Sequence, residues 1–192
     1  MAEPMIQTRI SAAEYLGLER AAEARHELID GEMVAMSGGS REHSLIAQNI
    51  GGELRGALRA KPCEVFNSDM RIGIEAMSRY TYADATVACG VPRFTDEKRD
   101  TLLNPTAVFE VLSDSTESYD RGEKFAGYRT VPSLQEYVLV SQKRELVEHF
   151  HRQADGSWLL RVCGAGETVS LPSLGCDLAV DEIYLKVFST PG

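Results

Sequence analysis

The chain has 192 residues, of which 43% are hydrophobic and 26% are charged, so it can enclose a core of ordinary size. Its formal net charge of −9 argues against a protein that coats nucleic acid through a basic surface, yet it permits an enzyme that meets phosphate through a metal ion and a few cations. No run approaches the roughly 18 apolar residues of a membrane helix, and the first residues lack the features of a secretion signal. We therefore expect one cytoplasmic domain over residues 1–192.

The first predicted elements are a helix and a hairpin. Ser11 and Glu14 have the S-x-x-E spacing of a capping box, which predicts a helix that starts at Ser11 and runs to about Arg25. The segment HELIDGEMVAMSGG follows as two strands, because Asp30-Gly31 is a strong signal for a tight hairpin turn.

A second helix is predicted from Ser40 to just before Lys61-Pro62. Its apolar residues recur at helical spacing: Leu45, Ile46, Ile50, Leu54 and Leu58. The same segment contains three glycines, at positions 51, 52 and 56, and each costs about 1 kcal/mol relative to alanine inside a helix. Close helix packing, or a contact in a homodimer, would compensate for that cost.

The middle of the chain is expected to be rich in strands. The predicted strands are Glu64–Phe66, Met70–Ile74, Tyr82–Cys89 and Ala107–Leu112. A polar, proline-interrupted loop, Val91–Pro105, separates the last two. A helix follows, with Asp120 as its N-cap and Glu123 completing a capping box, and it runs to about Thr130.

The C-terminal part is predicted to be mostly β-structure. The expected strands are Gln135–Val140, Leu146–His151 and Trp158–Cys163, with turns at Lys143-Arg144 and Asp155-Gly156. Residues 179–188 are compatible with a short helix or strand. The order of elements predicts a mixed central sheet flanked by helices, with extra antiparallel strands at the end, which is an α/β or α+β fold.

The four cysteines, Cys63, Cys89, Cys163 and Cys176, carry no metal-binding pattern. None forms C-x-x-C, and no histidine lies at zinc-ligand spacing from them. Cys89 and Cys163 lie in apolar runs and are interpreted as small core residues. Disulfides are not expected in a cytoplasmic protein.

The strand Ala107–Leu112 contains an acid where none is expected. Strand alternation places Val108, Glu110 and Leu112 on one face, and the opposite face is wholly apolar. An ionised carboxylate in such a strand is costly unless a positive group meets it. Asp84 is a second acid of this kind, set between apolar neighbours in TYADATVACG.

Lys124 lies in the helix that follows and has a stem long enough to bring its ammonium back over the strand. Two neighbouring carboxylates need a cation, and Mg²⁺ prefers carboxylates together with waters and substrate phosphate. The three residues thus indicate metal-assisted phosphodiester hydrolysis. Taken singly, Glu110 could pair with a buried arginine, Asp84 could cap a strand end, and Lys124 could face solvent.

The ordered set of these motifs resembles a known family. An Asp, a strand Glu and a Lys on α-β-β-β-α-β order are similar to the PD-(D/E)XK restriction-endonuclease superfamily. More narrowly, residues 8–163 resemble the Uma-type (Uma-two) family of proposed endonucleases through HELIDGEMVAMS, SDMRIGI, FEVLSDSTESYDRGEKFAGYR and VPSLQEYVLV. The resemblance implies a restriction-endonuclease-like fold, DNA as substrate and Mg²⁺ as cofactor, with Mn²⁺ as a substitute.

The resemblance also implies roles for particular residues. Asp84 and Glu110 would bind the metal, with the Val111 carbonyl as a further ligand, and Lys124 would be the family's migrated lysine. Glu27 would be the additional N-terminal acid of the site.

Two positions leave these implied roles open. The usual E-x-K lysine would fall at position 112, where this chain has Leu112. Glu32 competes with Glu27, because a shift of one residue in the hairpin register would exchange the acid that points inward. A non-catalytic nuclease fold that binds nucleic acid or a protein partner is therefore the alternative function.

Weaker candidates surround this set. Arg121 could meet phosphate, and Tyr128 stands one helical turn beyond Lys124. His43 begins the second helix and could act in catalysis, although a solvent-facing role is favoured. His149 and His151 share one strand face and permit a metal pair, but with no third ligand evident an exposed face is expected.

Overall fold

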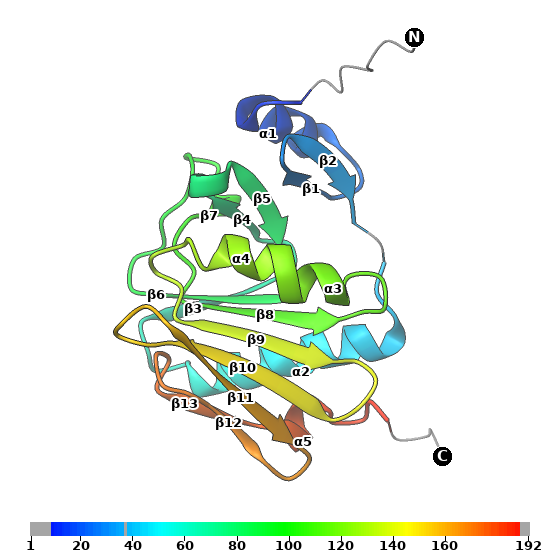
Figure 1. The fold of residues 1–192 in the computed structure, drawn as a ribbon, viewed down its shortest axis with the longest axis vertical. Coiled ribbons are helices and arrows are strands. Elements are labelled where there is room, and N and C mark those ends of the chain that lie inside the picture. Colours follow the sequence, from blue (N-terminus) through cyan, green and yellow to red (C-terminus); the bar gives the residue numbers. More distant parts are fainter. Residues whose placement is uncertain (1–8, 37, 189–192) are drawn as a thin grey trace.

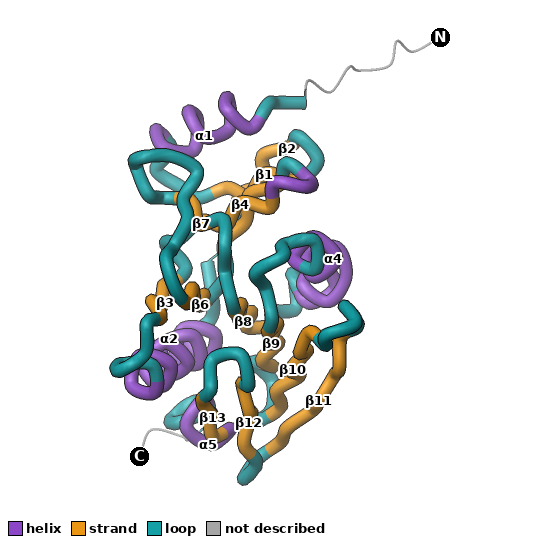
Figure 2. The backbone as a smooth tube through the Cα atoms, turned by 90° about the vertical axis from the view of Figure 1, so that its left-hand side faces the viewer, coloured by secondary structure: helices purple, strands orange, loops and turns teal. Residues whose placement is uncertain are grey.

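The computed structural model describes residues 9–36 and 38–188. A six-stranded sheet forms its centre, with helix α2 (Arg41–Ala57) against one face and helix α4 (Phe125–Tyr128) against the other (Figures 1 and 2). A five-stranded sheet with helix α1 (Ala12–Ala21) lies at the N-terminal side, and a two-stranded sheet lies near the C-terminus. The fold is mixed α/β, as the order of elements predicted.

The central sheet has the strand order β11-β10-β9-β8-β6-β3. Its strands are β3 (Cys63–Asn67), β6 (Ala85–Cys89), β8 (Ala107–Leu112), β9 (Glu136–Ser141), β10 (Leu146–Arg152) and β11 (Trp158–Gly164). Strands β8 and β9 are parallel and all other neighbours are antiparallel. All six residues of β8 are buried, as the alternation of two apolar faces predicted.

The two faces of this sheet form separate apolar cores. On one face α2 buries Ile46, Ile50, Leu54 and Leu58 against Phe109 and Val111 of β8 and against the C-terminal hairpin. On the other face Phe125 stacks on Tyr137 with ring centroids 4.6 Å apart. Phe150 and Trp158 pack against this second core, in agreement with their interpretation as core residues.

The five-stranded sheet has the order β2-β1-β5-β4-β7. Its strands are β1 (His26–Ile29), β2 (Glu32–Ala35), β4 (Arg71–Ile74), β5 (Arg79–Tyr82) and β7 (Thr101–Leu102), and the short 3₁₀ helix η1 (Glu75–Met77) joins β4 to β5. The predicted turn at Asp30-Gly31 is confirmed, and both residues have the positive φ of a tight hairpin turn (51° and 85°). The prediction that Val91–Pro105 is a loop was wrong in part, because this segment contains β7, which pairs in parallel with β4.

The predicted strand Tyr82–Cys89 is divided between the two sheets. Strand β5 ends at Tyr82 in the five-stranded sheet, and β6 begins at Ala85 in the central sheet. Ala83 and Asp84 form the crossing, so Asp84 lies at a strand end rather than within a strand. Aspartate is a poor strand former, and its side chain here bonds the backbone of β8 in place of a continued ladder.

The helix after β8 starts earlier than predicted. It consists of α3 (Glu117–Tyr119), a π-helical turn η2 (Asp120–Lys124) and α4. Asp120 has helical φ and ψ (−62° and −40°), so its assignment as N-cap was wrong. The hydroxyl of Ser113 accepts a hydrogen bond from the Thr116 N–H at 3.2 Å, immediately before the first helical residue, Glu117.

The C-terminal hairpin pairs β12 (Thr168–Leu171) with β13 (Cys176–Ala179), and helix α5 (Val180–Ile183) follows. A disulfide joins the register partners Cys63 and Cys89 of β3 and β6, which contradicts the expectation that all cysteines are reduced. Cys163 and Cys176 are free. Within the described ranges, no helix is long and apolar enough to span a bilayer.

The glycines of α2 lie on an open face. A Cβ atom built on Gly51, Gly52 or Gly56 would meet nothing within 4 Å in the described chain. Close helix packing within the chain, one of the two proposed compensations, is therefore wrong for this segment.

Candidate active site

Glu110 and Lys124 meet in a buried ion pair. The Lys124 ammonium lies 3.0 Å from Glu110 Oε1, and the Tyr128 hydroxyl donates to the same oxygen at 3.3 Å. The exposed fractions of Glu110 and Lys124 are 4% and 7%. The lysine therefore reaches back over strand β8 rather than into solvent, and the buried cation beside Glu110 is a lysine rather than an arginine.

Lys124 has three further contacts. It donates to the Tyr82 carbonyl at 2.9 Å and lies 3.4 Å from Glu27 Oε1 and 3.6 Å from Asp120 Oδ1. Asp120 and Lys124 begin and end the π-helical turn, which turns both side chains toward the sheet. One ammonium is thus shared by carboxylates from β1, β8 and η2.

The hairpin register decides between the two N-terminal acids. Glu27 is buried, and its Oε1 accepts hydrogen bonds from the Thr81 hydroxyl and from the Tyr82 N–H, the latter at 3.1 Å. Glu32 is paired with Ile29 across the turn and is exposed. Of the two, Glu27 therefore faces the pocket.

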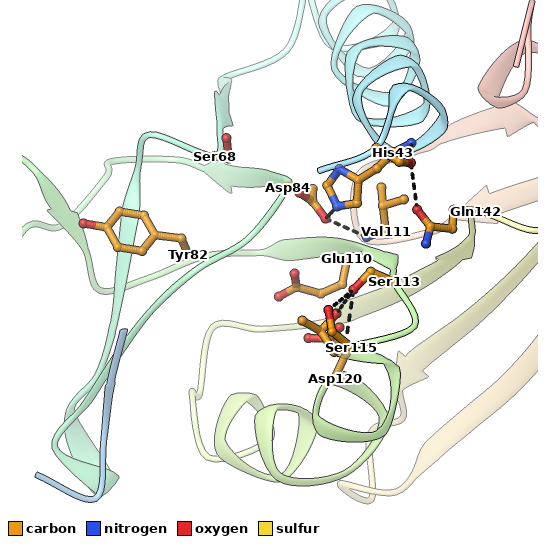
Figure 3. Close-up of polar contacts among 12 residues, drawn as sticks. His43, Ser68, Tyr82, Asp84, Glu110, Val111, Ser113, Ser115, Asp120 and Gln142 are labelled. Carbon is orange, nitrogen blue, oxygen red and sulfur yellow. Dashed lines mark hydrogen bonds and ion pairs between the residues drawn. The ribbon is translucent and has the colours of Figure 1, made fainter. Parts of the chain in front are cut away.

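Asp84 approaches Glu110 from the neighbouring strand. The last ladder pair of β6 and β8 is Ala85 with Phe109, so Asp84 and Glu110 lie one step beyond it. Asp84 Oδ2 accepts the Val111 N–H at 2.7 Å (Figure 3). Because the N–H and C=O of one strand residue point to the same side, the Val111 carbonyl faces this edge as well.

His43 enters the site from the start of α2, where the Ser40 hydroxyl caps the helix. Its Nε2 lies 3.3 Å from Asp84 Oδ2, and Figure 3 shows its ring beside that carboxylate. Hydrogen bonding to Asp84 raises the pKa of His43, and Asp120 adds to this effect. Sequence reasoning favoured a solvent-facing position for His43, which was wrong.

The buried cluster around Lys124, called the carboxylate pocket, contains more acidic side chains than basic ones. Its four carboxylates are those of Glu27, Asp84, Glu110 and Asp120. Burial raises the pKa of Glu110 well above its usual value, and burial raises that of Asp120. Burial alone would lower the pKa of Lys124, but Glu110, Glu27 and Asp120 outweigh it and raise that pKa. Four ionised carboxylates would exceed the positive charge of Lys124 and a protonated His43.

Two carboxylate oxygens remain available in this pocket. Within residues 9–36 and 38–188, Asp84 Oδ1 and Glu110 Oε2 make no hydrogen bond or ion pair, because their contacts use Asp84 Oδ2 and Glu110 Oε1. Carboxylate and carbonyl oxygens are the ligands that Mg²⁺ prefers. The donor set and the charge of the pocket therefore fit a hard divalent cation.

The comparisons with known proteins decide the family. A model of the Uma2 family, described as "Putative restriction endonuclease", matches residues 12–181. The chain belongs to the Uma2 family. The resemblance predicted from the four motifs is thereby confirmed.

Two relatives and one solved structure are similar to this Uma2 chain. The uncharacterized proteins slr1290 and sll1609 of Synechocystis sp. are 40% and 38% identical, over 92% and 79% of this chain and 92% and 85% of their own lengths. A crystal structure described as "a putative nuclease belonging to DUF820" from Anabaena variabilis superimposes with a TM-score of 0.76 at 18% identity, covering 93% of this chain and 99% of that one. That likeness shows a shared fold.

Three positions of the Uma2 chain complete the account of its candidates. Leu112, at the position of the usual lysine, is buried in the core beside α4, so the amine of this site comes from the helix. Arg121 pairs with Glu117 and Glu148 and does not join the pocket. Asp120 is the residue that sequence reasoning misassigned, although its place four residues before Lys124 is a signal that both share one helix face.

Proposed function

We propose that this Uma2-family chain is a Mg²⁺-dependent endonuclease that hydrolyses phosphodiester bonds in DNA. The observation that carries the proposal is the buried cluster in which three carboxylates contact Lys124 and Asp84 lies beside Glu110, while Asp84 and Glu110 each keep one oxygen free. The family description, "Putative restriction endonuclease", supports the same class of reaction.

Asp84, Glu110 and the Val111 carbonyl would hold the metal ion, and Mn²⁺ would substitute for Mg²⁺ because the ligands are oxygens. When bound, the ion supplies Lewis-acid stabilisation of the phosphate and a more acidic water.

The remaining residues would position Lys124 and the acids. Glu27 and the Tyr82 carbonyl hold the ammonium beside Glu110, where it acts as a fixed positive charge near the negative charge that develops on the phosphate. Tyr128 donates to Glu110 Oε1 and would keep the other oxygen of that carboxylate turned toward the metal.

A second function, a nuclease fold that binds nucleic acid or a protein without cutting, is favoured by one observation. Lys124 is already engaged by three carboxylates and a carbonyl, which leaves it fewer free donors for a substrate. The net charge of −9 and Leu112 at the usual lysine position point the same way.

The test is cleavage of supercoiled, linear and single-stranded DNA, and of RNA, by the purified chain with Mg²⁺ or Mn²⁺. We expect Asp84→Asn and Glu110→Gln to abolish cleavage and Glu27→Gln to slow it by about 100-fold or more. Glu32→Gln is the matched control on the same hairpin and should cut at the wild-type rate.

The two functions give different results in this assay. A catalytic site predicts metal-dependent cutting together with a metal-induced rise in melting temperature that Glu110→Gln removes. No cutting of any nucleic acid, with a metal response that ignores Glu110→Gln, would leave the binding function in its place. A homodimer and a cytoplasmic location stay predictions; light scattering tests the first and cell fractionation the second.

A further inference from the structure

A second group of metal-binding side chains lies away from the carboxylate pocket. Within residues 9–36 and 38–188, Glu136, His149 and His151 form the one group of three or more whose ligand atoms all lie within 4.8 Å of one another. Glu136 begins β9, its partner across the ladder is His151 of β10, and His149 lies two residues earlier on the same face.

The histidine pair was expected on an exposed strand face without a third ligand, and both points are wrong. The neighbouring strand supplies Glu136, and the C-terminal hairpin covers the face. The exposed fractions are 0% for Glu136 and 2% for His149, and the side chain of His151 is 27% exposed. Two ligands are therefore fixed in the interior while His151 leaves a route from solvent.

The orientation of Glu136 is set by Ser173. The backbone N–H and the hydroxyl of Ser173 donate to Glu136 Oε1 at 2.9 and 2.7 Å. The other oxygen, Oε2, lies 2.5 Å from His149 Nε2 and 2.9 Å from His151 Nδ1. Ligating carboxylates are held by outer hydrogen bonds of this kind, which leave one oxygen directed at the metal.

We propose that Glu136, His149 and His151 bind a divalent transition-metal ion of the zinc class. Two imidazole nitrogens and one carboxylate oxygen are a ligand set that suits Zn²⁺ and leaves a fourth position for water. The carboxylate pocket, by contrast, offers only oxygens. An ion at Glu136 would also offset the charge of a carboxylate that has no access to water.

The ligand atoms now stand at hydrogen-bond separations, with each imidazole able to donate an N–H to Oε2. A tetrahedral ion with bonds of about 2.0–2.2 Å holds its ligand atoms about 3.3 Å apart. Binding therefore requires Glu136 Oε2 to move away from the two imidazole nitrogens by less than about 1 Å and each imidazole proton to move to the other ring nitrogen. Both changes leave the backbone of β9 and β10 in place.

The site is separate from the carboxylate pocket. In the parallel ladder Glu136 is paired with Ala107 at the start of β8, whereas Glu110 is paired with Leu139 toward its end. The ion would join β9 and β10 directly and, through Ser173, the turn between β12 and β13. It would thus fasten the C-terminal hairpin to the central sheet.

The test uses the full chain with Asp84→Asn and Glu110→Gln to disable the first pocket and Cys163→Ser and Cys176→Ser to remove the free thiols. Zn²⁺ is titrated by calorimetry, and Co²⁺ is followed by its visible absorption. We expect one ion per chain and a higher melting temperature with Zn²⁺ but not with Mg²⁺. Ser173→Ala should weaken Zn²⁺ binding by about 10- to 100-fold.

His151→Gln is the decisive variant, because its partly exposed side chain can change without loss of the fold. It should abolish the Co²⁺ spectrum, whereas His26→Gln should not; His26 is the matched control, since it also pairs with a buried glutamate, Glu19, at 3.1 Å. No Zn²⁺ binding by the four-substitution chain, or equal binding with and without His151→Gln, would overturn the proposal.

Discussion

Glu110 and Lys124 are both buried, but they do not depend on each other equally. Lys124 has two further carboxylates within 3.6 Å, so it keeps partners when Glu110 is removed. Glu110 has one ammonium and one hydroxyl, and burial raises its pKa. Substitutions of the two residues should therefore change stability in opposite directions.

Glu110→Gln should raise the free energy of unfolding of the metal-free protein by on the order of 1 kcal/mol. Because the folded-state pKa of Glu110 lies above 4.5, the wild-type protein loses stability as pH rises from about 4.5 toward that pKa. Glutamine does not titrate, so the advantage of the variant should grow between pH 5 and pH 8. Urea unfolding at the two pH values measures it.

Lys124→Met is the contrasting change and should lower the free energy of unfolding by about 3–5 kcal/mol, because it leaves buried carboxylates without their cation. A stable Lys124→Met variant beside a destabilised Glu110→Gln variant would contradict this account of the pocket. Mg²⁺ should partly restore the stability of Lys124→Met.

The residues that sequence reasoning found were those whose polarity conflicts with their surroundings. Glu110 and Asp84 were identified because their sequence neighbours are apolar. Lys124 was identified because it lies in the helix directly after the strand of Glu110, with a side chain long enough to reach back to it. Asp120 was interpreted as an N-cap and His43 as a solvent-facing residue, because polar residues are ordinary near helix starts. The direction in which these side chains point depends on where each helix begins and on the π-helical turn at Asp120–Lys124. The pattern of polar and apolar residues predicts neither feature.

At the scale of elements, the glycines of α2 are expected to lower the free energy of unfolding, and a substitution can measure this effect. Gly52 is exposed, and a Cβ there would meet nothing within 4 Å. Gly52→Ala should therefore raise the free energy of unfolding by about 1 kcal/mol through helix propensity. Gly127→Ala in α4 is the control, because its Cβ would meet Ile74 at 3.2 Å, and it should gain less or destabilise.

The same variant examines the proposed homodimer. If the glycine face of α2 forms the dimer contact, Gly52→Ala will also weaken self-association, which sedimentation velocity measures. A gain in monomer stability with unchanged association would show that the dimer, if formed, uses another face.

A capping box predicted α1, helical spacing predicted α2, alternation predicted β8, and turn residues predicted the hairpin of β1 and β2; α1 ends at Ala21, earlier than the predicted end near Arg25. These sequence patterns failed where the end of a helix or strand is set by contacts with residues distant in sequence. The break between β5 and β6 exists because two sheets compete for one apolar run, and Asp84 bonds across to Val111 at that point. The disulfide of Cys63 with Cys89 follows from strand register, which no local pattern contains.

At the scale of the molecule, we propose that the two larger sheets fold as one domain. Lys124, held on the helix that joins β8 to β9, contacts Glu27 and Tyr82 of the five-stranded sheet. Ile72 and Ile74 of that sheet also lie in the core beneath α4. These shared contacts predict a single cooperative unfolding transition.

Trp158 makes this prediction measurable. It is the one tryptophan of the chain and packs on Phe125 against the central sheet, with ring centroids 5.3 Å apart. Its fluorescence reports the central sheet, whereas far-ultraviolet circular dichroism reports the whole backbone. The two urea curves should coincide; a dichroism change that precedes the fluorescence change would mean that the five-stranded sheet unfolds separately.

The family and the fold class were accessible from sequence because the motifs occur in a fixed order along most of the chain. The arrangement of the sheets was not, because β7 pairs with a strand distant in sequence and the short hairpin of β12 and β13 packs on a core formed by distant segments. Glu136 escaped notice for the same reason: its partners lie on β10 and beyond β12.

The π-helical turn before α4 has a consequence for how this chain can change over time. Such a turn holds one residue more than α-helical winding of the same length, and each residue of an α-helix advances it by about 100°. Loss of a single residue from Asp120–Lys124 would let the helix wind evenly with its two halves in place, yet it would shorten the spacing between Asp120 and Lys124, so that both side chains no longer point toward the sheet. One small deletion would then preserve the architecture of the fold while removing the contact of Lys124 with Glu110.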